Sequence, residues 1–233
     1  MVAGVAVPSS RDQERRGRNA LARALLAGAA LLAALVGCGG EAPLTGTDLG
    51  KRPAPDFALT DQRGQTVRLS DLRGKAVALT FVYTHCPDVC PLTVENLRAA
   101  HELLPEGARD EVALVAVTLD PERDTLAARQ DFSARHRLAG NPSWYALGGD
   151  RVTLERIWRD YGIYPGEHPA ARVPHHAASP GATPSDAIAL PSAYTLSHTD
   201  ATYLIDPEGR ERVLLRADVG PTVLAENLER LVA

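Results

Sequence analysis

The chain of 233 residues is 45% hydrophobic and 23% charged, which suits one globular domain of ordinary size with additional segments. Three cysteines are too few for a scaffold held by disulfides, so apolar packing must supply the core. The formal charge of −4 divides unevenly, because residues 1–37 hold five Arg against Asp12 and Glu14. The remainder therefore carries 20 basic and 27 acidic residues, and a net acidic body argues against nucleic acid as a partner.

The amino-terminal segment has the pattern of a secretory signal. Five arginines accompany the apolar run ALLAGAALLAALVG, which ends at Gly37 and is short for a membrane-spanning helix. We therefore interpret residues 1–37 as a signal peptide. The run ends in LVGC, which resembles the lipobox of bacterial lipoproteins, and this resemblance implies that Cys38 becomes the lipidated first residue of the mature chain.

An uncleaved anchor helix is the alternative interpretation of this segment. Both interpretations place the body outside the cytoplasm, anchored to the membrane of a bacterial cell envelope. Residues 39–55, GGEAPLTGTDLGKRPAP, are rich in Gly and Pro. We expect the lipidated cysteine and a flexible tether to occupy 38–55, and a single domain to occupy 56–233.

The domain begins with a short hairpin, because residues 56–75 alternate apolar and polar side chains about an RG turn. The continuous apolar run at 76–83 predicts a buried strand. Residues 91–104 repeat their leucines near helical spacing, with Pro91 suited to the first turn. Residues 112–119 predict a second buried strand.

The second half continues with two helices at 124–136 and 150–162, each opened by an aspartate that can cap it. A hairpin formed by 202–206 and 212–218 follows, and an amphipathic helix at 221–232 ends the chain. The order β-α-β-α-(β)-α-β-β-α predicts a layered α/β sandwich with a mixed central sheet.

One stretch interrupts this order. Residues 165–192, PGEHPAARVPHHAASPGATPSDAIALPS, are rich in Pro, Ala and Ser and have no hydrophobic period. We expect them to form a mobile surface insertion.

Two of the three cysteines, Cys86 and Cys90, lie four residues apart between a predicted strand and a predicted helix. Backbone N–H groups and the positive end of the helix dipole lower a thiol pKa at such a junction. Residues i and i+4 of a first helical turn face the same side, so both sulfurs can point at one ion or at each other. Pro87 and Pro91 stiffen the loop.

The pair admits three interpretations: a structural disulfide, a redox couple, or half of a metal site. A disulfide across so small a loop constrains the unfolded chain little, which weakens the first. Zinc would lack ligands unless several histidines converged.

The segment FVYTHCPDVCP (81–91) resembles the signature of the Sco/SenC family of copper-binding, thioredoxin-like proteins. VTLDPERDT (117–125) and LSHTDATYLIDPEGR (196–210) are similar to two further segments of that family. The likeness runs from Phe57 to the carboxyl terminus, interrupted mainly at 165–192. It implies a thioredoxin-like three-layer sandwich with an added amino-terminal hairpin.

The family's ligand histidine corresponds to His198, so the resemblance implies a copper site made of Cys86, Cys90 and His198. Soft sulfur favours Cu(I), while imidazole also accommodates Cu(II). A three-coordinate site leaves room for a partner's ligand and suits handover of the metal. Asp88, between the cysteines, is interpreted as a helix cap or surface carboxylate.

The other histidines and the DPERD segment receive lesser roles. His85 is expected to point away from the site, because its neighbour Cys86 faces it. His101 and His136 are expected on solvated faces of helices. His168, His175 and His176 lie in the predicted insertion, where they would capture copper loosely at most. The charged residues Asp120, Arg123 and Asp124 are expected to cap and brace the next helix, with a supporting role near the site.

The resemblance implies a membrane-tethered copper chaperone that assists assembly of the binuclear copper centre of cytochrome c oxidase. Its partners would be the copper-site subunit of the oxidase, other periplasmic copper carriers, or thioredoxin-like reductants. The main alternative is an enzyme, a thiol–disulfide oxidoreductase that uses Cys86 and Cys90 without metal. A thioredoxin-like peroxidase and a lipoprotein with a purely structural or binding role are further alternatives.

Overall fold

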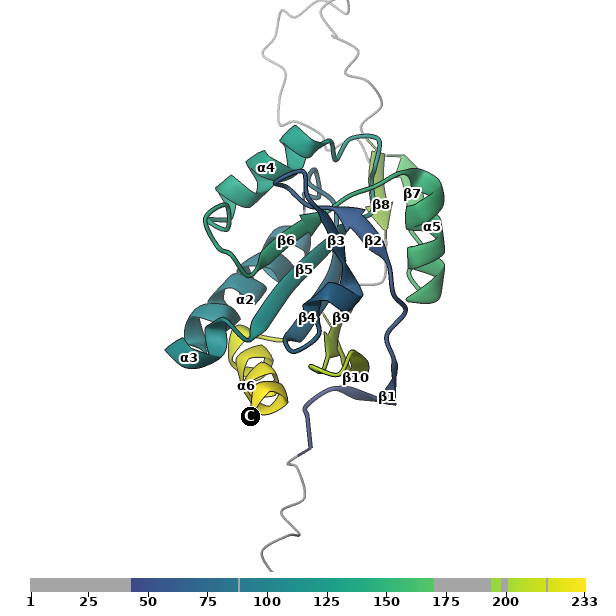
Figure 1. Ribbon diagram of the computed structural model, residues 1–233. Coiled ribbons are helices and arrows are strands. Elements are labelled where there is room, and N and C mark those ends of the chain that lie inside the picture. Colours follow the sequence, from purple (N-terminus) through teal and green to yellow (C-terminus); the bar gives the residue numbers. More distant parts are fainter. Residues whose placement is uncertain (1–42, 88, 170–193, 198–200, 217) are drawn as a thin grey trace, which may run out of the picture. The chain divides into compact units, whose positions relative to one another are not determined.

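The computed structural model describes residues 43–87, 89–169, 194–197, 201–216 and 218–233 (Figure 1). Contacts divide the chain into two units, and the second, residues 44–233, holds the helices and strands described below. Among the described residues, none of the helices combines the length and apolar character needed to cross a membrane.

The centre of this unit is a six-stranded mixed sheet. The strands follow the order β1-β10-β9-β4-β5-β6 across the sheet. Neighbours β4, β5 and β6 are parallel, whereas β9 is antiparallel to β4, β10 to β9 and β1 to β10. Their bounds are β1 Thr47–Pro53, β4 Ala76–Val82, β5 Val112–Thr118, β6 Trp144–Leu147, β9 Ala201–Ile205 and β10 Arg210–Arg216. The predicted mixed sheet is therefore confirmed.

The two central strands explain why the sheet forms where it does. All seven residues of β4, AVALTFV, and all seven of β5, VALVAVT, are buried. Strands that are covered on both faces read as continuous apolar runs, as these do. Their parallel register pairs Ala76 with Val112 and Val82 with Thr118, so both strands end at the same edge of the sheet.

Helices cover the sheet on both sides. The helix α6 packs against α2 and contacts β4, and α5 lies on the opposite side of the sheet in Figure 1. On the α5 side, the Trp158 indole donates to the carbonyl oxygen of Thr118 at 3.1 Å. The helix bounds are α2 Val89–Leu103, α3 Glu106–Arg109, α4 Leu126–Arg135, α5 Arg151–Asp160 and α6 Pro221–Val232.

The predicted amino-terminal hairpin is confirmed as β2 Ala58–Thr60 and β3 Thr66–Arg68, followed by the short 3-10 helix η1 Leu69–Leu72. Its turn is held by the buried carboxylate of Asp61, which accepts the backbone N–H groups of Arg63 and Gln65 at 2.8 and 2.9 Å.

One of the two predicted helix caps is wrong. Asp150 caps α5 as predicted, accepting the N–H of Thr153 at 2.9 Å. The cap of α4 is Thr125, whose hydroxyl accepts the N–H of Ala128, and not Asp124. The carboxylate of Asp124 is instead buried and bonds the hydroxyl groups of two threonines, so it cannot reach the first turn of α4.

The tether predicted over 38–55 does not extend to residues 47–53, which form the edge strand β1. The sequence does not predict this strand, because Leu49 is its only half-buried residue and the others are exposed, so no alternation of apolar and polar residues is present. Its pairing with β10 is also irregular, since Gly50 and Lys51 have positive φ angles of 72° and 61°. The fold domain therefore begins before residue 56.

The first residues of the predicted insertion at 165–192 include a strand. β7 Gly166–Pro169 pairs with β8 Tyr194–Ser197 as a separate two-stranded sheet, so backbone pairing overrides the lack of an apolar pattern. Residues 170–193 lie outside the described part of the chain, and their predicted mobility stays a prediction.

A substitution at Gly46, just before β1, tests this fold. Gly46 has φ +129°, and a Cβ atom there would lie 2.9 Å from the carbonyl oxygen of Leu214 and would collide with Val213. We expect Gly46→Ala to lower the free energy of unfolding in urea by about 2–4 kcal/mol, from backbone strain and overpacking. Gly50→Ala is the matched control, because φ is +72° there but no atom lies within 4 Å.

Gly50→Ala should lower the free energy of unfolding only through backbone strain, by about 1 kcal/mol. Equal and small losses for the two variants would show that the segment preceding β1 does not pack against β10.

Candidate metal centre

The cysteine loop joins β4 to α2. After Val82, Tyr83 is buried, and the N–H of Cys86 donates to the carbonyl oxygen of Tyr83 at 3.2 Å, closing a turn. The helix α2 begins at Val89, so Cys90 lies in its first turn. The predicted placement of both cysteines at a strand-to-helix junction is confirmed.

The two cysteines differ in their exposure to solvent. Cys90 is 1% exposed, whereas Cys86 is half-buried, and the structure carries both as thiols. The backbone N–H of Cys90 points at the Cys86 sulfur, with an N–Sγ distance of 3.5 Å. A backbone donor at a helix start stabilises the thiolate over the thiol. The geometry therefore favours Cys86 as the reactive sulfur and Cys90 as the shielded one.

Asp124 anchors the residue that begins this loop. Its Oδ1 accepts both the backbone N–H of Thr84, at 3.0 Å, and the Thr84 hydroxyl, at 2.6 Å. Its Oδ2 accepts the hydroxyl of Thr118, the last residue of β5. Burial raises the pKa of Asp124, against the hydrogen bonds from Thr118 and Thr84, which lower it.

The DPERD segment is itself braced. The guanidinium of Arg123 forms an ion pair with the buried carboxylate of Asp120, and the backbone N–H groups of Arg123 and Asp124 donate to the carbonyl oxygen of Asp120. The predicted bracing by these residues is thus present, but it acts on the turn between β5 and α4. Sequence reasoning missed that Asp124 reaches across to the cysteine loop, because 40 residues separate Asp124 from Thr84.

His85 is turned toward this same network. Its side chain is 53% exposed, with Nδ1 2.9 Å from the Thr84 hydroxyl and 3.9 Å from Oδ1 of Asp124. Within the described ranges, no group of three His, Cys, Asp or Glu side chains is arranged to hold a metal ion. His85 is therefore not assembled with the two thiols into a three-ligand set.

Two histidines predicted as solvated are not. His101 is 8% exposed, and its Nε2 lies 3.1 Å from the carbonyl oxygen of Arg109, because α3 folds back over this face of α2. His136 is mostly covered, and its Nδ1 lies 3.1 Å from the carboxylate of Glu95. Both are occupied with structural partners away from the cysteine loop.

Other predicted positions lie outside the part of the chain that the structure describes: Cys38, Asp88, His175, His176 and His198. The side chain of His168 belongs with them. The backbone on either side of His198 is described, since β8 ends at Ser197 and β9 begins at Ala201. Because β9 pairs antiparallel with β4, with Thr202 opposite Thr80, its start lies at the sheet edge where the cysteine loop leaves.

The thiol pair suits a soft metal ion. Two sulfurs at positions i and i+4 can face one ion, and thiolate ligands favour soft or borderline metals such as Cu(I) and Zn(II). An imidazole donor from the segment before β9 would complete a Cys₂His set from the sheet edge just described.

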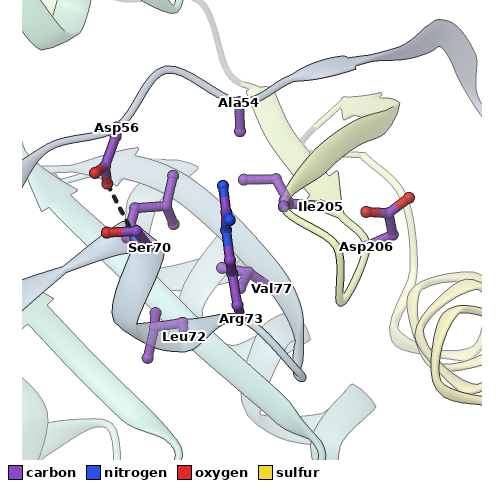
Figure 2. A pocket seen from close by; sticks show the side chains of 10 residues that line it. Ala54, Asp56, Ser70, Leu72, Arg73, Val77, Ile205 and Asp206 are labelled. Carbon is purple, nitrogen blue, oxygen red and sulfur yellow. Dashed lines mark hydrogen bonds between the residues drawn. The ribbon is translucent and has the colours of Figure 1, made fainter.

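A pocket elsewhere in the molecule is separate from this centre. It is lined by residues from the start of β4, the end of β9 and η1, with Arg73 lying across it (Figure 2). Asp56 at its rim accepts the N–H of Ser70 at 3.0 Å. Val77 in its wall stands near the amino end of β4, whereas the cysteine loop follows the carboxyl end.

The architecture is an α/β sandwich of the thioredoxin-like type, with a cysteine pair at the start of its first long helix. The model of the SCO1/SenC family matches residues 46–233. The chain belongs to the SCO1/SenC family. The resemblance seen in the sequence is thereby confirmed, as is the fold class.

Similar proteins give this family a copper context. The chain is 30% identical to "Bradyrhizobium japonicum ScoI with copper bound", with a TM-score of 0.57 over 77% of this chain and 99% of the other. It is 31% identical to apo Sco1 from Thermus thermophilus, with a TM-score of 0.59 over 84% and 96% of the two chains.

A mitochondrial SCO2 homolog from Bos taurus is 33% identical over 155 residues, which is 66% of this chain and 50% of the relative. The chain thus spans about half the length of the curated mammalian relatives that it matches.

The burial of His101 predicts a pH dependence of stability. Burial lowers its pKa in the folded state below the ordinary value near 6.5, so below that pH the unfolded chain binds the proton more readily. The stabilising contribution is therefore present above pH 6.5 and lost as the pH falls toward 5. Urea unfolding between pH 7.5 and 5 should show a smaller loss in His101→Gln, whereas an unchanged slope would contradict the assignment.

Proposed function

We propose that the protein is an extracytoplasmic copper chaperone that holds copper through Cys86, Cys90 and His198. The observation that carries this proposal is the pair of thiols at the β4–α2 junction, with the N–H of Cys90 directed at the Cys86 sulfur. Membership of a family with copper-bound members supports copper as the cargo.

The unequal exposure of the two sulfurs suggests how copper would be exchanged. The buried Cys90 sulfur would stay bound, because incoming ligands reach it poorly. The half-buried Cys86 sulfur would be displaced first by a partner's ligand. Copper can pass between sites in steps that never release the ion, since a three-coordinate site accepts a fourth ligand.

We propose the copper-site subunit of cytochrome c oxidase as the acceptor, on the basis of family membership. Other periplasmic copper carriers or thioredoxin-like reductants would supply the metal or keep the cysteines reduced. We further propose that residues 1–37 are a signal peptide and that lipidated Cys38 anchors the domain at the bacterial cell envelope.

Copper titration of the full-length chain in detergent solution tests the ligand set. We expect one Cu(I) per chain. Cys86→Ser, Cys90→Ser and His198→Ala should each weaken binding by more than about a hundredfold, since even losing a hydrogen-bond partner of a ligand costs 10–100-fold. Cys38→Ser is the matched control. This variant should keep full copper affinity but should no longer be found in the membrane fraction of cells. Copper affinity retained in His198→Ala would refute the Cys₂His set.

The same Cys86 environment also supports the alternative of a thiol–disulfide oxidoreductase, because a half-buried sulfur facing a backbone donor can attack a disulfide. The test is reduction of insulin by the reduced chain with copper removed by a chelator. A chaperone should show at most slow turnover, whereas an enzyme should show strong turnover that His198→Ala leaves unchanged. Rapid turnover without metal would favour the enzyme.

A further inference from the structure

The pocket beneath Arg73 has a fixed frame and lies away from the cysteine pair. Val77 of β4 and Ile205 of β9 are paired neighbours in the central sheet and form part of its wall, at the amino end of β4. The N–H of Gly74 donates to the carbonyl oxygen of Pro207 at 2.9 Å, which ties the segment after η1 to the β9–β10 turn. The cavity is therefore formed by paired strands and a bonded turn before any ligand arrives.

Gly209 places the side chain of Arg73 over this pocket. The φ angle of Gly209 is +80°, and a Cβ atom there would lie 3.3 Å from Nε and 3.8 Å from Cγ of Arg73. The arginine stem thus lies against the glycine backbone, and its guanidinium group stands between Ala54 and Ile205 (Figure 2). Among the residues that the structure describes, none forms a hydrogen bond or an ion pair with that guanidinium group. Its charge is therefore available to a ligand in the pocket.

Two carboxylates line the same pocket, but both have other partners. Asp206 is bound by Arg210 at 2.9 Å and by Arg212 at 3.3 Å, and it is turned away from Arg73 in Figure 2. Oδ1 of Asp56 accepts two backbone N–H groups at 3.0 Å each. These acids do not neutralise the guanidinium group, and their charges oppose a ligand with more than one negative charge. A singly charged carboxylate is favoured over a phosphate dianion.

The floor of the pocket is apolar. Four aliphatic side chains line it, each no more than 7% exposed: Leu69, Leu72, Val77 and Ile205. The planar guanidinium of an arginine matches both oxygens of a carboxylate, and an aliphatic group gains free energy by leaving water for an apolar surface. An apolar floor beneath an available guanidinium group therefore fits a ligand that combines these two parts.

We propose that the Arg73 pocket binds a monocarboxylate that carries a short aliphatic group, either a free acid or the carboxyl-terminal residue of a peptide. The carboxylate pairs with the Arg73 guanidinium group, and the aliphatic group contacts the floor. Because the pocket lies at the end of β4 opposite to the cysteine loop, this binding is separate from the proposed copper function.

Titration of the full-length chain with isobutyrate, followed by ¹H–¹⁵N NMR in a nonionic detergent, tests the proposal. We expect saturable shifts of the backbone N–H signals of Ala54, Gly74 and Gly209, which surround the pocket. Isobutyramide keeps the aliphatic group without the charge, and formate keeps the charge without the aliphatic group. Both should bind more weakly than isobutyrate, isobutyramide by at least about tenfold, and phosphate should also bind more weakly.

Substitutions of Arg73 test the guanidinium group itself. Arg73→Gln should weaken isobutyrate binding by at least about tenfold, because the charge-assisted hydrogen bonds are lost. Arg73→Lys should be intermediate, since it keeps the charge and loses the planar fork. Arg156→Gln is the matched control, because Arg156 is an exposed arginine of α5 outside the pocket lining. Arg73 is exposed as well, so all three variants should keep the urea midpoint of the parent chain.

The source of the carboxylate is distinguished by the dipeptide acetyl-Ala-Val with a free carboxyl terminus and by its amide. Tighter binding of the free dipeptide than of isobutyrate assigns the pocket to peptide ends, and weaker binding assigns it to free acids. The amide should not bind in either case. Isobutyrate binding that survives Arg73→Gln, isobutyramide or phosphate binding as tight as isobutyrate, or no saturable shift at all would each overturn the inference.

Discussion

The burial of β4 and β5 on both faces is the constraint on which the rest of the structure depends. Both parallel strands are buried along their whole length, and their pairing register brings their ends, Val82 and Thr118, opposite each other. The loops that leave this edge carry the cysteine pair on one side and the DPERD turn on the other. The candidate centre therefore lies at the carboxyl ends of β4 and β5, where the buried apolar strands are followed by loops that hydrogen bonds hold in place.

The Asp124 carboxylate links these two loops across that edge. Polar groups that leave a buried sheet must find partners, and Asp124 satisfies a strand-end hydroxyl and a loop N–H together. Its contact at Thr84 lies two residues before Cys86, so the position of the thiol pair is coupled to the end of β5. In this way the fold supplies a rigid base for the two cysteines, which we propose exchange a metal.

The sequence predicts the parts of the fold in which a single pattern dominates. The apolar runs at 76–83 and 112–119 and the helix that follows the cysteines could all be located, and with them the strand-to-helix junction that holds Cys86 and Cys90. β1 could not, because an edge strand with one half-buried side chain has no apolar period. Asp124 was assigned as a helix cap because a local pattern does not show a contact with a residue 40 positions earlier. His101 was misplaced for a similar reason, since α3 covers it.

We propose above all that the β4–α2 junction is a copper site with two sulfur ligands. X-ray absorption at the copper edge of the loaded full-length chain measures the ligand atoms directly. We expect two sulfur scatterers and one nitrogen scatterer around each copper ion. A spectrum fitted by nitrogen and oxygen scatterers alone would contradict it.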